Sequence, residues 1–400
     1  MVIVGGGLGG LAAALAMRGT CDISVIERSA QFGEVGAGIN LSPNAVKVLR
    51  ELGLEDALLR CSFQPRHHVF RDWRSGRSLF RADIGSAYET LFGAPHLSVH
   101  RADLHNLLAA EVPTRNVRFS ARCREVVQRP DCAVVMLEDG EEIEADVVIG
   151  ADGIRSAVRE SLFGPDQPQF TGNAAWRFTV PTERLPHPVE PGLTNWLGPG
   201  GHLVHYYVRG GALLNVVAVH ETDDWAAESW TLPGDRAEMS HVFGQWNDRV
   251  TALLGSAENC FKWGLFDRPP LQRWSKGRVT LLGDAAHPML PFMGQGAAMA
   301  LEDGLSLGLL LSARDRSIED SLAMYQGARI ARTARVQRGS RSRAQENHLR
   351  SPFARWVRNA KFKLRQFANP HATLHNGEWI YGYDVRQALG EATCASSSVR

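Results

Sequence analysis

Cysteine is scarce in this chain of 400 residues, and its six cysteines are scattered. None of them forms a Cys-x-x-Cys motif or a cluster with the spacing of zinc ligands, so the sequence predicts no structural metal site. A chain of this length buries most of its surface on folding and needs neither disulfides nor metal for stability. We therefore expect a reduced, cytoplasmic protein without a bound metal.

Long apolar runs and an excess of charge of one sign are also missing. No stretch reaches the roughly 18 apolar residues of a membrane span, and no basic leader precedes the apolar residues 2–4. The formal net charge of +1 gives no reason to expect a nucleic-acid or membrane partner. Because the first strand is so short, we also expect the natural chain to begin a few residues earlier.

The first 26 residues predict a β-α-β unit. Residues 2–4 and 23–26 are read as strands, and the Ala/Leu-rich residues 8–18 between them as a helix. Residues 147–149 are apolar without alternation, and the mainly apolar residues 279–282 return to this pattern, which predicts strands buried on both faces. Together these segments indicate a doubly wound α/β fold that binds a dinucleotide.

The turn after the first strand contains the pattern Gly-x-Gly-x-x-Gly as Gly5, Gly7 and Gly10. Glycines there let the backbone approach a pyrophosphate, which the N-terminus of the following helix stabilises. Glu27 ends the second strand, where an acidic side chain would hold ribose hydroxyls. We add Arg28 to the expected cofactor site. The pattern does not distinguish FAD from NAD.

Two further motifs follow buried strands. Asp152 and Gly153 stand between a strand and a predicted helix, where the aspartate could also be a structural N-cap. Gly283 and Asp284 stand in the same position after the last buried strand, and a carboxylate there can accept hydrogen bonds from sugar-alcohol hydroxyls. We expect both motifs to contact the cofactor.

A glycine-rich loop leads from the last motif to a helix that begins at Gly296 and Ala297. The N-terminus of that helix would stabilise negative charge on the pyrimidine edge of a reduced flavin. Pro291, Phe292 and Met293 within the loop offer an apolar wall for an aromatic ring. The alternative is a loop and cap with a structural role only.

The remaining segments complete the expected secondary structure. Residues 170–271 are rich in tryptophan, proline and short β runs, which indicates a largely antiparallel second domain. Arginines recur about every three residues along the last long helix, and we interpret them as a solvated face or subunit contact, with steering of anionic reactants as the alternative. We expect the serine-rich residues 396–398 to be disordered. Further expectations are helices at 44–59, 102–111, 296–311 and 318–349, a hairpin at 66–80, short strands across 117–143 with a turn at Asp139-Gly140, and a hairpin turn at Gly210-Gly211.

The three motifs, in this order, resemble the class A flavoprotein monooxygenases, the family of para-hydroxybenzoate and salicylate hydroxylases. The resemblance covers nearly the whole chain, and residues 379–384 are similar to the tails of salicylate-hydroxylase-type members. It implies an α/β fold with a Rossmann-type FAD domain, a mainly antiparallel substrate domain and a helical C-terminal region. The implied boundaries are 1–65, 97–170 and 272–345 for the FAD domain, 66–96 and 171–271 for the substrate domain, and 346–400 for the extension.

The resemblance also implies the cofactors. FAD would be bound, with NADH or NADPH as a transient co-substrate. The glycine turn and Glu27 would hold its ADP part, and the Asp152 motif would serve both FAD and the nicotinamide reaction. The Asp284 motif would hold the ribityl region. Arg101 matches an arginine that contacts FAD in the family.

The strand at 202–207 carries the candidate catalytic side chains. Alternation places His202 and Tyr206 on one face and His205 on the other. Histidine suits the removal of a phenolic proton because its ordinary pKa is near 6.5. In 3-hydroxybenzoate 6-hydroxylases and 6-hydroxynicotinate 3-monooxygenases a histidine and a tyrosine at this spacing line the pocket. The alternative is a satisfied structural pair.

The resemblance implies hydroxylation of a small phenolic aromatic acid with O2 through a flavin C4a-hydroperoxide. Salicylate, converted to catechol with loss of CO2, is the preferred substrate. Hydroxynicotinate enzymes carry histidines where this chain has Asn40 and Phe292, and 3-hydroxybenzoate enzymes carry glutamine where it has Pro291. Those two reactions remain alternatives, as do an FAD oxidase or dehydrogenase without oxygen insertion and an FAD-binding protein without catalysis. Arg209 and Arg74 are imaginable carboxylate partners, and a homodimer is a further expectation.

Overall fold

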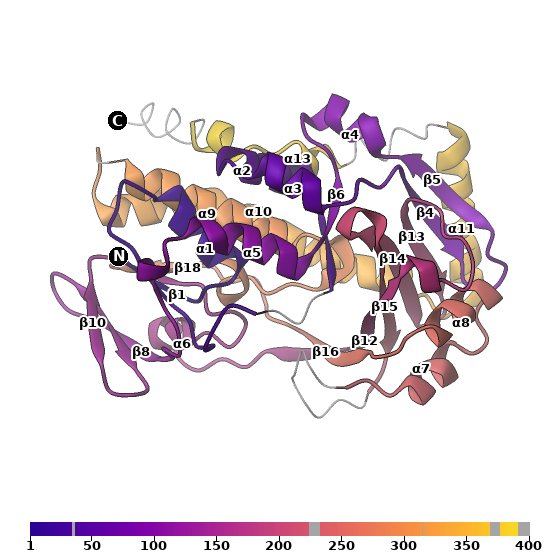
Figure 1. The fold of residues 1–400 in the computed structure, drawn as a ribbon, viewed down its shortest axis with the longest axis horizontal. Helices are drawn as coiled ribbons and strands as arrows, with labels where there is room; N and C mark the ends of the chain where they lie inside the picture. Colours follow the sequence, from indigo (N-terminus) through magenta and orange to yellow (C-terminus); the bar gives the residue numbers. More distant parts are fainter. Residues whose placement is uncertain (34–36, 224–232, 314, 369–376, 391–400) are drawn as a thin grey trace.

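The computed structural model describes residues 1–33, 37–223, 233–313, 315–368 and 377–390. The residues at 396–398, for which disorder is expected, lie outside this part. Figure 1 shows one half of the chain, with its sheet below α9 (Gly296–Ser312) and α10 (Ile318–Asn347), beside a half built on a larger sheet. No helix of the described part is long and apolar enough to cross a membrane.

A six-stranded sheet in the order β17-β18-β11-β1-β2-β7 forms the centre of the first half. All strands are parallel except β17. The four strands expected at 2–4, 23–26, 147–149 and 279–282 are confirmed, and they are neighbours in this sheet. The strands are β1 (Val2–Val4), β2 (Ser24–Ile26), β7 (Val117–Arg118), β11 (Val148–Gly150), β17 (Ser275–Lys276) and β18 (Val279–Leu281).

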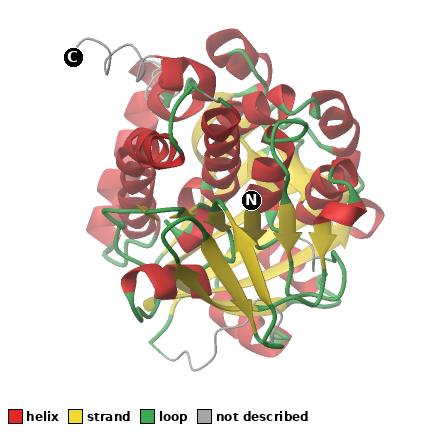
Figure 2. Cartoon of the chain, turned by 90° about the vertical axis from the view of Figure 1, so that its left-hand side faces the viewer, coloured by secondary structure: helices red, strands yellow, loops and turns green. Residues whose placement is uncertain are grey.

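Helices α1 (Leu8–Ala16) and α9 (Gly296–Ser312) pack closely against each other in this half. Figure 2 shows helices in red gathered above strands in yellow. A Cβ on Gly304 would lie 2.8 Å from the carbonyl oxygen of Gly9, and one on Gly308 would lie 2.1 Å from the Cβ of Ala16. The sequence of α9 therefore permits a helix contact that larger side chains would prevent. The long helix α10 (Ile318–Asn347) packs on α9 in turn.

A seven-stranded sheet in the order β16-β12-β15-β14-β13-β4-β5 forms the second half. Its neighbours are antiparallel except the parallel pair β13 and β4. Both expected hairpins, with turns at Ser75-Gly76 and Gly210-Gly211, are confirmed. The strands are β4 (His67–Asp72), β5 (Ser78–Asp83), β12 (Gln169–Pro181), β13 (Leu193–Gly198), β14 (Gly201–Val208), β15 (Leu213–Glu221) and β16 (Phe261–Asp267).

Each face of this sheet has a different partner. One face carries a core that includes Trp176, Phe178 and Phe243 and is covered by two short helices. The other face packs Val219 and Trp263 with the loop that follows β18. The covering helices are α7 (Arg236–Phe243) and α8 (Asp248–Gly255).

The single helix expected at 44–59 is wrong. The chain forms α2 (Pro43–Glu51) and α3 (Glu55–Cys61) instead, because Gly53 adopts a left-handed φ of +80° that ends the first helix.

The remaining elements agree with the expectations or were not assigned from sequence. They are β3 (Gly38–Leu41), α4 (Gly85–Phe92), β6 (Leu97–His100), α5 (Arg101–Glu111), β8 (Cys123–Gln128), β9 (Ala133–Leu137), β10 (Glu142–Ala145), α6 (Ala157–Phe163), α11 (Pro352–Ala368) and α13 (Glu378–Tyr381).

The arginines of α10 do not form a solvated face, so that interpretation is wrong for the first two. Arg329 is fully buried and Arg332 is 9% exposed. Arg335 lies 3.7 Å above the ring of Trp379, and Arg341 pairs with Asp267 at 2.6 Å. A step of three residues falls about 60° short of a full turn of the helix, so the series winds round α10 from buried Arg329 to exposed Arg338.

Candidate active site

The three sequence motifs meet at one edge of the six-stranded sheet. Val4 pairs with Gly150, and Gly150 pairs with Leu281, so the three parallel strands end at the same level. Residues that directly follow such strands lie side by side at the carboxyl edge, where doubly wound folds bind their ligands. The glycine turn, the Asp152 motif and the Asp284 motif are therefore brought together by strand register.

The glycine turn has the geometry of a phosphate-binding turn. Gly5 has a φ of +111°, and a Cβ there would lie 2.4 Å from the carbonyl oxygen of Ala151. Gly7 is the N-cap of α1; no side chain caps that helix, and a Cβ on Gly7 would meet no atom within 4 Å. A Cβ on Gly10 would lie 2.1 Å from the carbonyl oxygen of Gly5. The turn is thus tightly packed inward and open at the helix N-terminus.

Glu27 supports the turn from the end of β2. Its carboxylate accepts hydrogen bonds from the backbone N–H groups of Gly6 and Ser29, each at 2.9 Å. Each oxygen has a second lone pair with which to accept a hydroxyl group. Arg28, directly after it, is exposed. The position expected for a ribose ligand is therefore occupied by a carboxylate held in a fixed orientation.

Asp152 contacts the start of α6 but is not its N-cap, so the structural alternative is wrong in that form. The N-cap is Ser156, whose hydroxyl accepts from the N–H of Arg159 at 2.9 Å. One carboxylate oxygen of Asp152 accepts from the N–H of Val158 in the first turn of α6 at 3.3 Å. The other oxygen is buried and has no hydrogen-bond partner among the described residues. Burial raises the pKa of this carboxyl, although hydrogen bonds from Ser156 and nearby N–H groups oppose the shift. Gly153 has a φ of +81°, and a Cβ there would meet open space.

Asp284 follows β18 within a short helical turn. Its side chain is accessible to solvent, yet the protein around it raises the pKa of its carboxyl, while the charges of His287 and Arg101 act to lower it. Arg101 begins α5, so the structure places this expected FAD contact close enough to influence Asp284. Gly283 has a φ of +58°, and its N–H donates to Asp303 at 2.9 Å.

These features fit FAD. The uncapped N-terminus of α1 with open space at Gly7 suits a pyrophosphate, the unpartnered oxygen of Asp152 suits a hydrogen-bond donor, and the accessible Asp284 suits ribityl hydroxyls. Gly296 and Ala297 begin α9, which also lacks a side-chain cap. In the described part of the chain no cluster of three or more His, Cys, Asp or Glu side chains could hold a metal ion.

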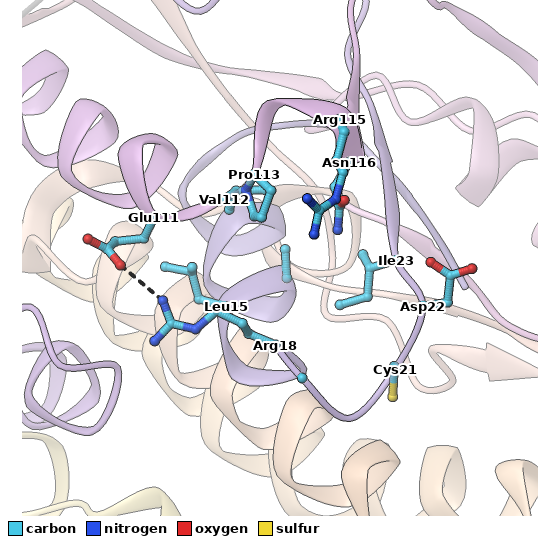
Figure 3. Close-up of a pocket in the computed structure, with 12 residues that line it drawn as sticks. Leu15, Arg18, Cys21, Asp22, Ile23, Glu111, Val112, Pro113, Arg115 and Asn116 are labelled. Atoms are coloured by element: carbon cyan, nitrogen blue, oxygen red, sulfur yellow. Dashed lines mark hydrogen bonds and ion pairs between the residues drawn. The ribbon is translucent and has the colours of Figure 1, made fainter.

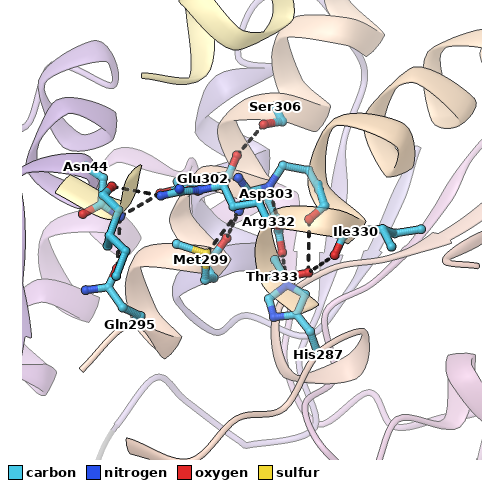
Figure 4. A network of polar contacts seen from close by, with 12 residues as sticks. Asn44, His287, Gln295, Met299, Glu302, Asp303, Ser306, Ile330, Arg332 and Thr333 are labelled. Atoms are coloured by element: carbon cyan, nitrogen blue, oxygen red, sulfur yellow. Dashed lines mark hydrogen bonds and ion pairs between the residues drawn. The ribbon is translucent and has the colours of Figure 1, made fainter. Parts of the chain in front are cut away.

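A buried network of charged side chains joins α9 to α10 (Figure 4). Asp303 contacts the Nε2 atom of His287 at 2.5 Å and accepts from Arg329 at 2.8 Å. Glu302 accepts from Arg329 at 2.5 Å and from Arg332 at 2.8 Å. All of these side chains are less than 10% exposed. Burial would raise the pKa of both carboxyls, but the neighbouring cations hold each pKa below its usual range.

The same network reaches the loop between β18 and α9. Glu302 also accepts from Asn44 at 2.7 Å, and Asn44 contacts Gln295, the N-cap of α9, at 3.2 Å. At its other end Arg332 donates to the carbonyl oxygens of Trp379 and Ile380 at 2.7 and 3.1 Å. The network therefore fixes both the start of α9 and the C-terminal segment.

His202 and Tyr206 lie on the sheet face that turns toward the loop after β18. His202 is 4% exposed, and its ring centroid lies 5.3 Å from that of Phe292. Burial, followed by the charge of His348, lowers the pKa of His202 well below its usual value. Burial raises the pKa of Tyr206 to about 12. His205 points to the opposite face and accepts from the indole of Trp196 at 3.2 Å.

The loop residues expected to line a substrate site are not equivalent. Phe292 is half-buried and contacts the rings of both His202 and His348. Pro291 is exposed, and Met293 packs against α10 at Gly339. Phe292 therefore faces the candidate histidine directly, and its two neighbours support the loop.

Two side chains of this site were not found from the sequence. His348, at the end of α10, lies with its Nε2 atom 2.7 Å from Nδ1 of His202. Arg177 of β12 donates to the carbonyl oxygen of Gly38 at 2.6 Å and interacts with the Tyr206 hydroxyl. Its guanidinium also lies 5.4 Å from the ring of Trp263. Alternation along β12 could have indicated the face of Arg177, but no local pattern indicates His348.

The two arginines imagined as carboxylate partners lie elsewhere. Arg209 forms a two-pronged ion pair with Asp103, with both distances 2.9 Å, and its side chain is 45% exposed. Arg74 is exposed in the turn between β4 and β5. Neither of them belongs to the face that carries His202.

A surface cavity near the end of α1, shown in Figure 3, is separate from this site. It lies at the end of the helix opposite Gly7, and Arg18 at its rim pairs with Glu111 at 2.9 Å. None of the residues from the three motifs lines it. We assign it no role in the chemistry.

Comparison with known proteins identifies the class. The family model described as FAD binding domain matches residues 1–340. A 3-amino-4-hydroxybenzoate 2-monooxygenase of Streptomyces platensis is 39% identical over 388 residues, covering 96% of each chain. Klebsiella pneumoniae HpxO complexed with FAD and uric acid is similar, with a TM-score of 0.84, 26% identity and coverage of 95% of this chain and 96% of its own. A salicylate hydroxylase substrate complex gives a TM-score of 0.82, 27% identity and coverages of 98% and 97%.

The chain belongs to the FAD binding domain family and has the para-hydroxybenzoate-hydroxylase-like fold of class A flavin hydroxylases. It is an FAD-dependent aromatic monooxygenase with NAD(P)H as its co-substrate. The expectations for fold, cofactor and enzyme class are thereby confirmed.

Proposed function

We propose that this enzyme hydroxylates a small aromatic acid that carries a ring hydroxyl group. The observation that carries the proposal is the grouping of His202, Tyr206 and Arg177 on one sheet face, with Phe292 opposite. These groups offer a base, a hydroxyl donor, a cation and an apolar wall. An aromatic acid with a ring hydroxyl matches these groups, because its hydroxyl can meet the base and the hydroxyl donor, its carboxylate the cation and its ring the apolar wall.

When bound, FAD supplies the activated oxygen at the expense of NAD(P)H and O2. His202 accepts the phenolic proton and makes the ring electron-rich; its lowered pKa keeps the imidazole neutral and ready to accept at neutral pH. Tyr206, with its raised pKa, stays protonated and donates a hydrogen bond. The Arg177 guanidinium pairs with the substrate carboxylate. Phe292 packs against the ring and excludes water.

For the cofactor we propose the contacts that the sequence indicated. The ADP part would lie against Gly5, Gly7, Gly10 and Glu27 near Arg28, and the ribityl and flavin parts against the later motifs. We retain the expected domain boundaries, with 1–65, 97–170 and 272–345 as the FAD domain. The later contacts are Arg101, Asp152, Gly153, Gly283, Asp284, Gly296 and Ala297.

Salicylate is the first substrate that we propose. Oxygen insertion at the ring carbon that bears the carboxylate would release CO2 and give catechol. Support comes from the likeness to the salicylate hydroxylase complex, which extends over 98% of this chain. The second candidate is 3-amino-4-hydroxybenzoate hydroxylated at position 2. It is favoured by the 39% identity to an enzyme of that name over 96% of both chains.

A substrate panel separates the candidates. We would measure NADH and NADPH consumption by the FAD-loaded enzyme with salicylate, 3-amino-4-hydroxybenzoate, 3-hydroxybenzoate and 6-hydroxynicotinate, and quantify product, CO2 and H2O2. Catechol and CO2 in amounts matching the NADH consumed would support salicylate. A hydroxylated acid that retains its carboxylate would support the second candidate. Only H2O2 with every compound, or no label in the product from labelled O2, would contradict the proposal and favour an oxidase or dehydrogenase.

A further inference from the structure

The pair of buried histidines connects the proposed substrate site to the surface. His202 uses Nδ1 for its 2.7 Å contact with Nε2 of His348. The Nε2 atom of His202 lies on the other edge of the ring, away from this contact with His348. The Nδ1 atom of His348 lies 3.8 Å from a carboxylate oxygen of Glu221, a separation that one bridging water can span.

Glu221 marks the outer end of this chain of contacts. Its side chain is 32% exposed and pairs with Arg350 at 2.6 Å. Both residues line a surface groove together with Pro199 and His220. The path therefore begins at a ring 4% exposed, passes through a second buried ring and ends at solvent.

We propose that His348 acts through His202, as the second member of a proton relay that ends at Glu221 and the surface groove. The inference rests on the proposed phenol hydroxylation. The phenolic O–H bond breaks as its proton goes to Nε2 of His202, and the proton on Nδ1 of His202 passes to Nε2 of His348. The proton on Nδ1 of His348 leaves to the carboxylate of Glu221, which releases it to solvent at the groove. One proton is transferred outward, and neither ring has to stay charged.

The surroundings of His348 keep its ring neutral, as the relay requires. Burial lowers its pKa to about 4, and the charges of His220, Arg350 and Arg358 act in the same direction. A neutral ring beside another neutral ring can be both donor and acceptor, whereas two charged rings would repel each other. The position of His348 is fixed, because Arg358 donates to the carbonyl oxygen of Asn347 at 3.2 Å.

The test compares His348→Gln with His348→Ala. Glutamine keeps a hydrogen-bonding group near His202 but cannot pass a proton through a ring. For a relay, both variants should slow hydroxylation on the order of tenfold to a hundredfold and shift its pH profile. Reduction of FAD by NADH should stay at the wild-type rate, and added imidazole should restore His348→Ala in part. If His348→Gln hydroxylates at the wild-type rate with the wild-type pH profile, the relay is overturned.

Glu221→Gln and Arg350→Gln form the matched pair at the outer end. Each removes the same ion pair, but only Glu221→Gln removes the group facing His348. We expect Glu221→Gln to slow hydroxylation and Arg350→Gln to leave it unchanged; equal effects of the two variants would contradict the relay.

A spectroscopic measurement separates this inference from the proposed function. If no phenol is hydroxylated by the wild-type enzyme, the proposed function fails. The relay is then decided by ¹⁵N NMR of the FAD-loaded enzyme labelled at histidine. Two neutral rings joined by an N–H···N bond that His348→Ala abolishes would support it, and rings without this bond would overturn it.

Discussion

The guanidinium of Arg329 is fully buried between α9 and α10. Its partners Glu302 and Asp303 are buried as completely, and the two carboxylates raise its pKa further although burial acts to lower it. Removing one member of such a group leaves the other charges buried and uncompensated. The stability of the fold therefore depends on every member of the network being present.

We predict that Arg329→Met lowers the free energy of unfolding by about 3–5 kcal/mol, the cost typical of breaking a buried ion pair. Arg338→Met is the matched control, because Arg338 lies on the same helix but is exposed. Arg338→Met should change the free energy of unfolding by no more than about 0.5 kcal/mol. Denaturant unfolding of both variants measures the difference, and equal stabilities would contradict the prediction.

Arg177 is the side chain whose proposed role concerns the substrate most directly. We predict that Arg177→Gln raises KM for the aromatic acid by about 10- to 100-fold, as expected for losing one hydrogen bond between charged groups. An analogue without the carboxylate should be affected much less. Arg209→Gln, which removes a surface ion pair instead, should leave both KM values unchanged. An equal loss for the acid and the uncharged analogue in Arg177→Gln would exclude the carboxylate contact.

The turn between β1 and α1 shows how one element serves both folding and binding. Gly5 faces the protein, where a Cβ would collide with Ala151, whereas Gly7 faces open space at the helix N-terminus. The two glycines satisfy the same sequence pattern for different physical reasons. Substituting each in turn therefore separates the two functions of the turn.

We predict that Gly7→Ala weakens FAD binding by at least about tenfold, because its methyl group projects where the pyrophosphate must approach, and leaves the stability of the FAD-free protein nearly unchanged. Gly5→Ala should reduce both the affinity for FAD and the stability of the FAD-free protein. The φ of +111° at Gly5 and its close approach to Ala151 oppose any side chain there. Titration with FAD followed by flavin fluorescence, together with thermal unfolding of the FAD-free protein, measures both quantities. Wild-type FAD affinity in Gly7→Ala would contradict the proposed contact.

At the scale of the whole molecule, several histidines of the described residues have a pKa lowered by burial. Burial lowers the pKa of His68 and His205 to about 3 and of His96 and His348 to about 4, and that of His202 also falls. In the unfolded chain these rings take up protons near pH 6.5. Below that pH the unfolded state binds more protons than the folded state, so stability falls as the pH falls toward 4.

We predict that the free energy of unfolding of the FAD-loaded enzyme falls by about 1.4 kcal/mol per pH unit below 6.5 for each histidine that stays neutral. Its urea midpoint should therefore decrease between pH 7.5 and pH 5. His96→Phe should make this dependence shallower, because both ring nitrogens of His96 are buried without partners in the described part of the chain. Substituting the exposed His241 should not change this dependence on pH. A midpoint that does not depend on pH would contradict the prediction.

The positions of the cofactor motifs were determined by the sequence itself. Apolar runs without alternation marked the buried parallel strands, and glycines and aspartates directly after them marked the sheet edge. Strand alternation also placed His202 and Tyr206 together on one face. These features are local, since each depends on residues within one strand or turn, and spacing along the chain reports them directly.

Only the tertiary structure decided the surroundings of these residues. The spacing of the α10 arginines indicated a common side of the helix, but α9 and the C-terminal segment bury Arg329 and Arg332 whereas Arg338 is exposed. His348 meets His202 across 146 positions of sequence. Arg177 enters the site because β12, β15 and β14 lie side by side. Contacts between distant segments depend on how elements pack, and no periodicity within a single element encodes that packing.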